Sequence, residues 1–112
     1  MEIQTKHVEP DIVVLEVTGR ITMGRDSKQL EWTTENLVRE HRKKIILDLT
    51  GVTQIDSTGI GIIMASAAQA KNAGGELRVA GANGHVEHVL RMTSVDKVVA
   101  FYPTTNAATD GF

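Results

Sequence analysis

The chain contains no cysteine, which excludes disulfides, thiol nucleophiles and cysteine-based metal sites together. Aromatic side chains make up only 4% of the residues, too few for a base-stacking surface. The formal net charge is only −2, so nothing draws the whole chain to nucleic acid or to an anionic membrane. No apolar run is long enough to span a membrane, and Met1 leads into a strand-like pattern instead of a signal peptide. We therefore expect a cytoplasmic protein with no direct nucleic-acid binding and no membrane insertion.

The remaining composition is that of an ordinary globular protein. Apolar residues make up 41% of the chain and charged residues 23%. A length of 112 residues is sufficient for one packed core and too short for two. We predict a single domain over residues 1–112, with a flexible or weakly helical tail at about 104–112.

Strand and helix patterns alternate along the chain. The predicted strands are residues 3–7, 12–17, 45–49, 76–80 and 98–101, with a short extended piece at 20–23. The predicted helices are residues 26–41, 57–73 and 86–93, and residues 50–55 are expected to connect a strand to a helix. Two strands separated by a short turn favour an antiparallel hairpin, whereas later strand–helix alternation requires parallel pairing. The fold class is therefore α/β, a mixed sheet with a parallel centre, an antiparallel N-terminal hairpin and about three to four helices.

The first predicted helix has a clear start signal. Asp26 is a suitable N-cap, and Gln29 three residues later completes a capping-box pattern. Leu30 and Leu37 follow on the stripe that points inward, together with Thr33. Trp32 lies off this stripe and is a candidate contact residue.

A hydroxyl residue stands where the most strand-like run meets the best helix. Ser57 follows Asp56 at this junction, and a helix N-terminus has unpaired N–H groups and a positive dipole end. Such a position suits an anion, including a phosphate on the serine itself. The local residues alone favour a plain N-cap for Ser57, with Asp56 as a turn residue and with Gly59 and Gly61 permitting close packing of the helix on the sheet.

Four segments together resemble the STAS-domain anti-sigma-factor antagonists of bacteria. They read KIILDLTGV at 44–52, IDSTGIG at 55–61, KNAGGELRVA at 71–80 and VLRMTSVDK at 89–97. A bare D-S-x-G is a weak signal, but its place between this strand and this glycine turn is specific.

The resemblance implies a STAS fold and a partner-switching function. In this family the serine after the motif's aspartate is phosphorylated by an anti-sigma factor that is also a serine kinase. The unphosphorylated antagonist binds that kinase and frees the sigma factor, and a serine phosphatase resets the switch. Carried onto this chain, the phosphoacceptor is Ser57, with Thr58 a less favoured acceptor and Asp56 an adjacent acidic contact.

The helix after Ser57 is apolar around nearly its whole circumference in its first turns. Ile60 lies on an inward stripe, whereas Ile62 and Ser66 lie on another side. Either a partner protein or a neighbouring helix should cover that second side. The predicted partner-binding residues are Asp56, Ser57, Thr58, Gly59, Ile60, Ile62 and Ser66.

Two other functions fit parts of this pattern. One is a STAS scaffold or transport-associated regulatory subunit that is never phosphorylated. The other is a small hydrolase or phosphatase, but no histidine lies near Ser57 in sequence and G-x-S-x-G is absent. His85 and His88 share a short helix without a carboxylate network, and Asp48 is expected to satisfy local backbone donors. We predict no catalytic activity, no metal ion and no cofactor.

Overall fold

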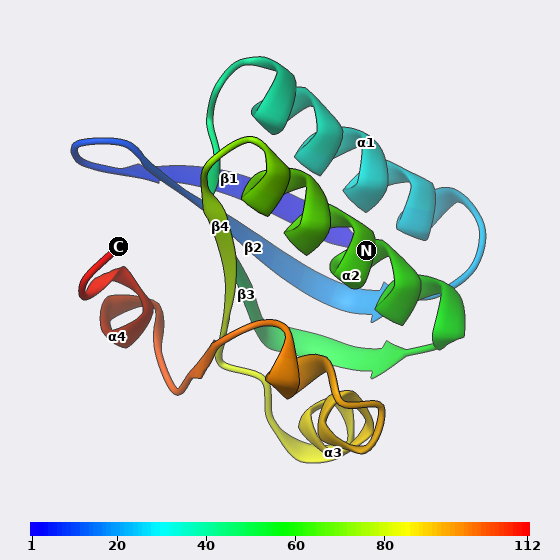
Figure 1. The fold of residues 1–112 in the computed structure, drawn as a ribbon. Helices are drawn as coiled ribbons and strands as arrows, with labels where there is room; N and C mark the ends of the chain where they lie inside the picture. The colour runs from blue at the N-terminus through cyan, green and yellow to red at the C-terminus, as the bar shows by residue number, and fades with distance from the viewer.

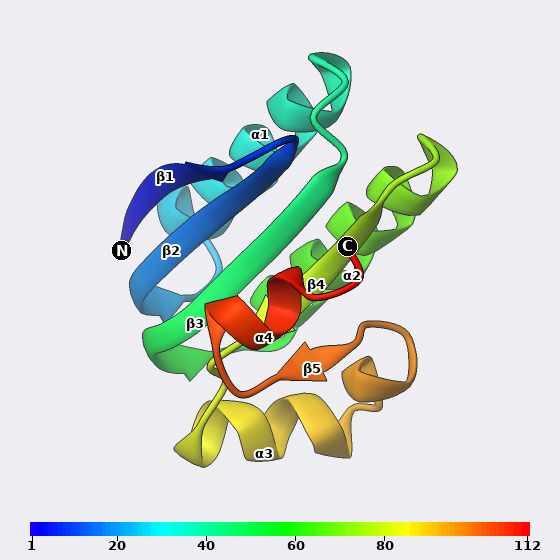
Figure 2. The same cartoon turned by 90° about the vertical axis from the view of Figure 1, so that its left-hand side faces the viewer.

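Five strands form one mixed sheet in the order β1-β2-β3-β4-β5 (Figure 1 and Figure 2). The computed structural model describes all residues 1–112. Its strands are β1 (Glu2–Val8), β2 (Ile12–Ile21), β3 (Lys44–Ile55), β4 (Glu76–Ala80) and β5 (Phe101–Tyr102). β1 and β2 pair antiparallel, and every other pairing is parallel. The predicted parallel centre and antiparallel N-terminal hairpin are confirmed.

The helices lie on both faces of this sheet. They are α1 (Arg25–Arg39), α2 (Ser57–Asn72), α3 (Gly84–Met92) and α4 (Thr105–Thr109), with a 3-10 turn η1 (Val95–Lys97) before β5. α1 and α2 pack side by side on one face, whereas α4 lies against the other (Figure 2). None of the helices combines the length and the apolar composition needed to cross a membrane.

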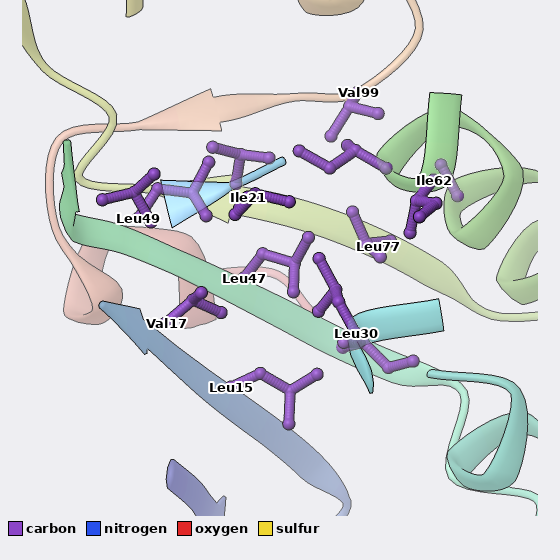
Figure 3. Close-up of a cluster of buried hydrophobic side chains, with 14 of the residues drawn as sticks. Leu15, Val17, Ile21, Leu30, Leu47, Leu49, Ile62, Leu77 and Val99 are labelled. Atoms are coloured by element: carbon purple, nitrogen blue, oxygen red, sulfur yellow. The ribbon is translucent and has the colours of Figure 1, made fainter. Parts of the chain in front are cut away.

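The main core fills the space between the sheet and the first three helices. It is a cluster of 21 buried residues, part of which is drawn in Figure 3. Leu15 and Leu47 face each other across β2 and β3, and Leu30 of α1 is fully buried with them. Ile46 of the same strand β3 joins a smaller cluster of five under α4. β3 is therefore covered on both faces, which explains its nearly unbroken apolar sequence.

β3 is longer than the sequence pattern predicted. Residues 50–55 were expected to connect a strand to a helix, but they continue β3 to Ile55. The reason is that β2 also continues to Ile21, which pairs with Ile55 after a register shift. The short extended piece expected at 20–23 is thus partly the end of β2.

The start of α1 differs from the predicted capping box. The N-cap is Gly24, with φ of 117°, and no side chain caps the helix. Asp26 lies inside the first turn instead, so its assignment as N-cap was wrong. The buried positions of α1 include Thr34 in place of Thr33, while Trp32 is exposed as expected.

The end of the chain is ordered as a helix over the second face. Ala108 of α4 is fully buried in the smaller cluster. The guanidinium of Arg78 donates to the backbone carbonyls of Ala108, Asp110 and Gly111 at 3.0, 2.9 and 3.3 Å. Within the predicted tail, residues 105–109 form α4. β5 also starts later than predicted, because the N–H groups of Val98 and Val99 donate to the carbonyl of Val95 in η1.

Candidate functional site

The candidate site lies at the junction between the end of β3 and the start of α2. Ile55 ends β3, Asp56 is the N-cap, and Ser57 is the first residue of α2. Asp56 has extended dihedrals, φ −111° and ψ −176°, and its carbonyl accepts the N–H of Ile60 at 3.0 Å. These features are those of a regular N-terminal cap.

The Asp56 carboxylate binds the first turn of α2 and the β2–α1 loop at once. Its Oδ1 accepts the N–H of Gly59 at 2.9 Å, which caps α2. Its Oδ2 accepts the N–H of Met23 at 2.8 Å, which ties down the loop between β2 and α1. The N–H of Met23, followed by that of Gly59, holds the pKa of Asp56 below its ordinary value. Asp56 is therefore a fixed negative charge beside Ser57 at neutral pH.

Ser57 is exposed at the positive end of α2. The capping role belongs to Asp56, so the reading of Ser57 as a plain N-cap is wrong and its hydroxyl is free of that role. Thr58 beside it is only half-exposed. Ser57 therefore supplies the more exposed of the two motif hydroxyls at the junction.

Gly59 serves packing. It is buried, and a Cβ at this position would collide with the carbonyl oxygen of Ile21. The same Cβ would lie 2.9 Å from a side-chain carbon of Ile55. Only glycine lets α2 approach the ends of β2 and β3 this closely. Gly61 differs, because it is exposed and a Cβ added there would have nothing within 4 Å.

Ile62 and Ser66 do not belong to an exposed partner surface. Ile62 is 7% exposed within the main core (Figure 3), and Ser66 is 4% exposed. The Ser66 hydroxyl lies 2.8 Å from the Thr34 hydroxyl of α1, both buried. The second side of α2 is therefore covered by the neighbouring helix α1, and assigning these two residues to partner binding was wrong. Ile60 stays half-exposed and keeps its place at the site.

Met23 is a site residue that the sequence did not single out. Its side chain is 77% exposed, among the most exposed large apolar side chains of the chain, and its N–H is bound to Asp56. The sequence around Met23 does not predict its contact with Asp56, because the two residues are 33 positions apart in the chain. Trp32 is also exposed, at 66%, on the outside of α1.

The other polar candidates have structural roles. Asp48 Oδ1 accepts from the N–H and the hydroxyl of Thr50 at 3.0 and 2.6 Å, and Oδ2 accepts from Thr105 at 3.4 Å. The expectation that Asp48 satisfies local donors is confirmed. His85 and His88 are both exposed on α3. A cleft of about 500 Å³ opens between the β4–α3 loop and the end of β5, and Ser57 is not among the residues that line it.

Residues 3–108 match the family model of the STAS domain. The chain belongs to this family. Ser57 therefore lies at the β3–α2 junction of a STAS domain.

Relatives of this STAS domain cover nearly its whole length. One from Thermotoga neapolitana, provisionally named an anti-sigma factor antagonist, is 28% identical over 98 residues, covering 88% of this chain and 87% of the relative. The crystal structure of a Thermotoga maritima protein with a similar provisional name has a TM-score of 0.88 at 27% identity, covering 96% of this chain and 92% of that one. Phosphorylated SpoIIAA of Bacillus has a TM-score of 0.76 at 15% identity, covering 97% of each chain, and shares the fold.

Proposed function

We propose that this STAS domain is an anti-sigma factor antagonist of the bacterial cytoplasm. In its unphosphorylated form it binds an anti-sigma factor that is also a serine kinase, and so releases a sigma factor. The kinase phosphorylates Ser57 and thereby ends the interaction, and a serine phosphatase restores it. The observation that carries the proposal is the exposed Ser57 hydroxyl at the first position of α2, next to a capping Asp56.

The comparisons support this class of function. The Thermotoga relatives carry the name of anti-sigma factor antagonist, and they align over nearly the whole of this chain. Two of the segments that carry the resemblance, 44–52 and 55–61, form the strand that leads into Ser57 and the first turn of the helix that begins there.

Charge at the junction explains how phosphorylation acts as a switch. A phosphate adds about −1.5 to −2 charges at neutral pH. At Ser57 this charge lies at the positive end of the α2 dipole, so the domain stays folded. It also lies beside the ionised Asp56. The partner therefore faces one negative group before phosphorylation and two adjacent negative groups after it. Docking is then lost through local repulsion and bulk.

The same geometry favours a target of chemistry over a catalyst. A nucleophilic serine needs a general base within hydrogen-bond reach. Asp56 is its neighbour, but both carboxylate oxygens of Asp56 accept backbone N–H groups. We therefore propose that the domain has no catalytic activity of its own.

The docking surface follows from the side chains that are exposed or half-exposed at the junction. It combines Asp56, Ser57, Thr58 and Ile60 with Met23 from the β2–α1 loop. Gly59 supports this surface from below through its close packing. We refer to these four residues together with Met23 as the switch surface.

The test is phosphorylation by a serine-kinase anti-sigma factor from the same genome. Incubation with that kinase and ATP should add one phosphate to the wild type by intact mass and none to Ser57→Ala. Thr58→Ala is the matched control and should still gain one phosphate. Binding to the kinase by calorimetry should be lost on phosphorylation. If the wild type binds but gains no phosphate, the non-phosphorylated scaffold is the better description.

A further inference from the structure

β1 is an open edge of the sheet. It is the outermost strand, and its seven residues pair only with β2. Figure 2 shows it at the free margin of the sheet, with the N-terminus at its outer end. The opposite edge strand, β5, has only two residues. β1 therefore carries the longest row of backbone N–H and C=O groups with no strand on the outer side.

This edge has few of the usual devices that prevent pairing with another chain. Proteins blunt such edges with proline, a bulge or charged side chains, especially lysine, on the edge strand. β1 contains no proline, and its pairing with β2 has no register shift. Its single lysine, Lys6, lies with Nζ 3.2 Å from Glu16 Oε2, so its charge is balanced within the sheet. The edge remains able to accept another strand.

We propose that β1 pairs antiparallel with β1 of a second copy of this chain, about a two-fold axis at Gln4. In this register Glu2 lies opposite Lys6 of the second copy, and Lys6 lies opposite Glu2 of that copy. Ile3 lies opposite Thr5, and Gln4 lies opposite its own equivalent. The two five-stranded sheets then form one continuous sheet, through an interface that is closed by symmetry.

The side-chain pattern of β1 selects this register. Even-numbered residues share one face of the strand, and Val8 and the Lys6–Glu16 pair place that face on the α4 side. A two-fold pairing that keeps both helical layers on the same side must be centred on a residue. A centre at Gln4 sets two opposite-charge pairs directly across, which stabilises antiparallel strands. A centre at Thr5 leaves Glu2 opposite Val8, and a centre at Lys6 sets two like charges together.

The arrangement has a consequence for the switch surface. β3 runs antiparallel to β1 within one copy, and Ser57 follows the end of β3. The two-fold axis reverses this direction in the second copy. The two Ser57 residues therefore lie at opposite ends of the joined sheet, and each copy can bind its own partner. The dimer itself does not depend on the function proposed for Ser57.

Sedimentation velocity of the full chain from about 1 µM to about 1 mM tests the pairing. Strand-edge interfaces are small, so the wild type should pass from monomer to dimer within this range. Glu2→Lys and Lys6→Glu each set like charges across the axis, and each alone should stay monomeric. An equimolar mixture of the two variants should dimerise, because the facing positions then carry opposite charges. Lys97→Glu, on the exposed η1 turn, is the matched control and should dimerise like the wild type.

Circular-dichroism melting of each variant confirms that its monomeric state is folded. A wild type that stays monomeric over the whole range would overturn the proposal. Single variants that dimerise as well as the wild type would place the interface elsewhere and overturn it too. So would a mixture of folded variants that fails to associate, since this register demands their complementarity.

Discussion

The backbone N–H of Met23 donates to Asp56 Oδ2 across 2.8 Å, so the loop after β2 is fixed to the start of α2. The other oxygen of the same carboxylate caps α2 through Gly59 at 2.9 Å. One acidic side chain thus sets the relative position of the two segments that flank Ser57. The exposed Met23 side chain and the exposed Ser57 hydroxyl are held in one surface by this carboxylate.

Replacing Asp56 should loosen both segments together. Asp56→Ala removes both acceptors, and we expect a lower thermal midpoint and faster amide exchange at Met23 and Gly59. Asp56→Asn keeps one carbonyl oxygen and should fall between the wild type and Asp56→Ala. Calorimetry and hydrogen exchange by NMR measure these effects. Faster exchange at Gly59 with unchanged exchange at Met23 would show that the loop is held by other contacts.

The lowered pKa of Asp56 gives the stability a defined pH dependence. A carboxyl group with a folded-state pKa below its unfolded value stabilises the fold above the unfolded value, here 3.8. That contribution is lost as pH falls through the lower folded-state pKa. The difference in thermal midpoint between the wild type and Asp56→Asn should therefore be constant near neutral pH and shrink below about pH 4. A difference that persists unchanged at acidic pH would mean that the charge of Asp56 is not its source.

Gly59 and Gly61 form a matched pair two residues apart on α2. Gly59→Ala places a methyl group against the Ile21 carbonyl, and we expect a loss of about 1–3 kcal/mol in the free energy of unfolding. Gly61→Ala meets open space in a helix interior, where alanine should add about 0.5–1 kcal/mol. Urea unfolding of both variants gives the comparison directly. Effects of the same sign would contradict the packing described for Gly59.

Met23 should contribute to partner binding without contributing to stability. Its side chain is 77% exposed, so Met23→Ala should change the free energy of unfolding by less than about 0.5 kcal/mol. As an apolar anchor of the switch surface, its loss should weaken binding to the serine-kinase anti-sigma factor by about tenfold. Met92→Ala is the matched control, since Met92 is 71% exposed on α3. Equal affinities for the two variants would remove Met23 from the docking surface.

Local sequence signals predicted most elements, and the failures have tertiary causes. β4 and the start of α2 at Ser57 agree with their patterns, because strong β-formers and a glycine turn surround them. The full length of β3 was not predicted, because its last residues form a strand by pairing with the end of β2, and a local pattern does not show that pairing. Ile62 and Ser66 were misplaced because α1 covers a second side of α2, which one helix's periodicity cannot show. The contact of Met23 with Asp56 likewise has no local sequence signal.

Arg78 should be the residue on which the C-terminal segment depends. Its side chain is 9% exposed, lies 3.0 Å from Glu76 Oε2 and stacks over the Phe112 ring at 4.1 Å. Its guanidinium also donates to three backbone carbonyls at and after the end of α4, where helix carbonyls lack partners within the helix.

Arg78→Met keeps much of the side-chain length but none of the donors, so we expect a loss of about 2–3 kcal/mol in the free energy of unfolding. Arg78→Lys keeps the charge without the planar fork and should recover only part of that loss. Hydrogen exchange should show the amides of α4 opening first in Arg78→Met, with α2 unaffected. Uniform loss of protection over the whole chain would mean that α4 and the sheet unfold as one unit.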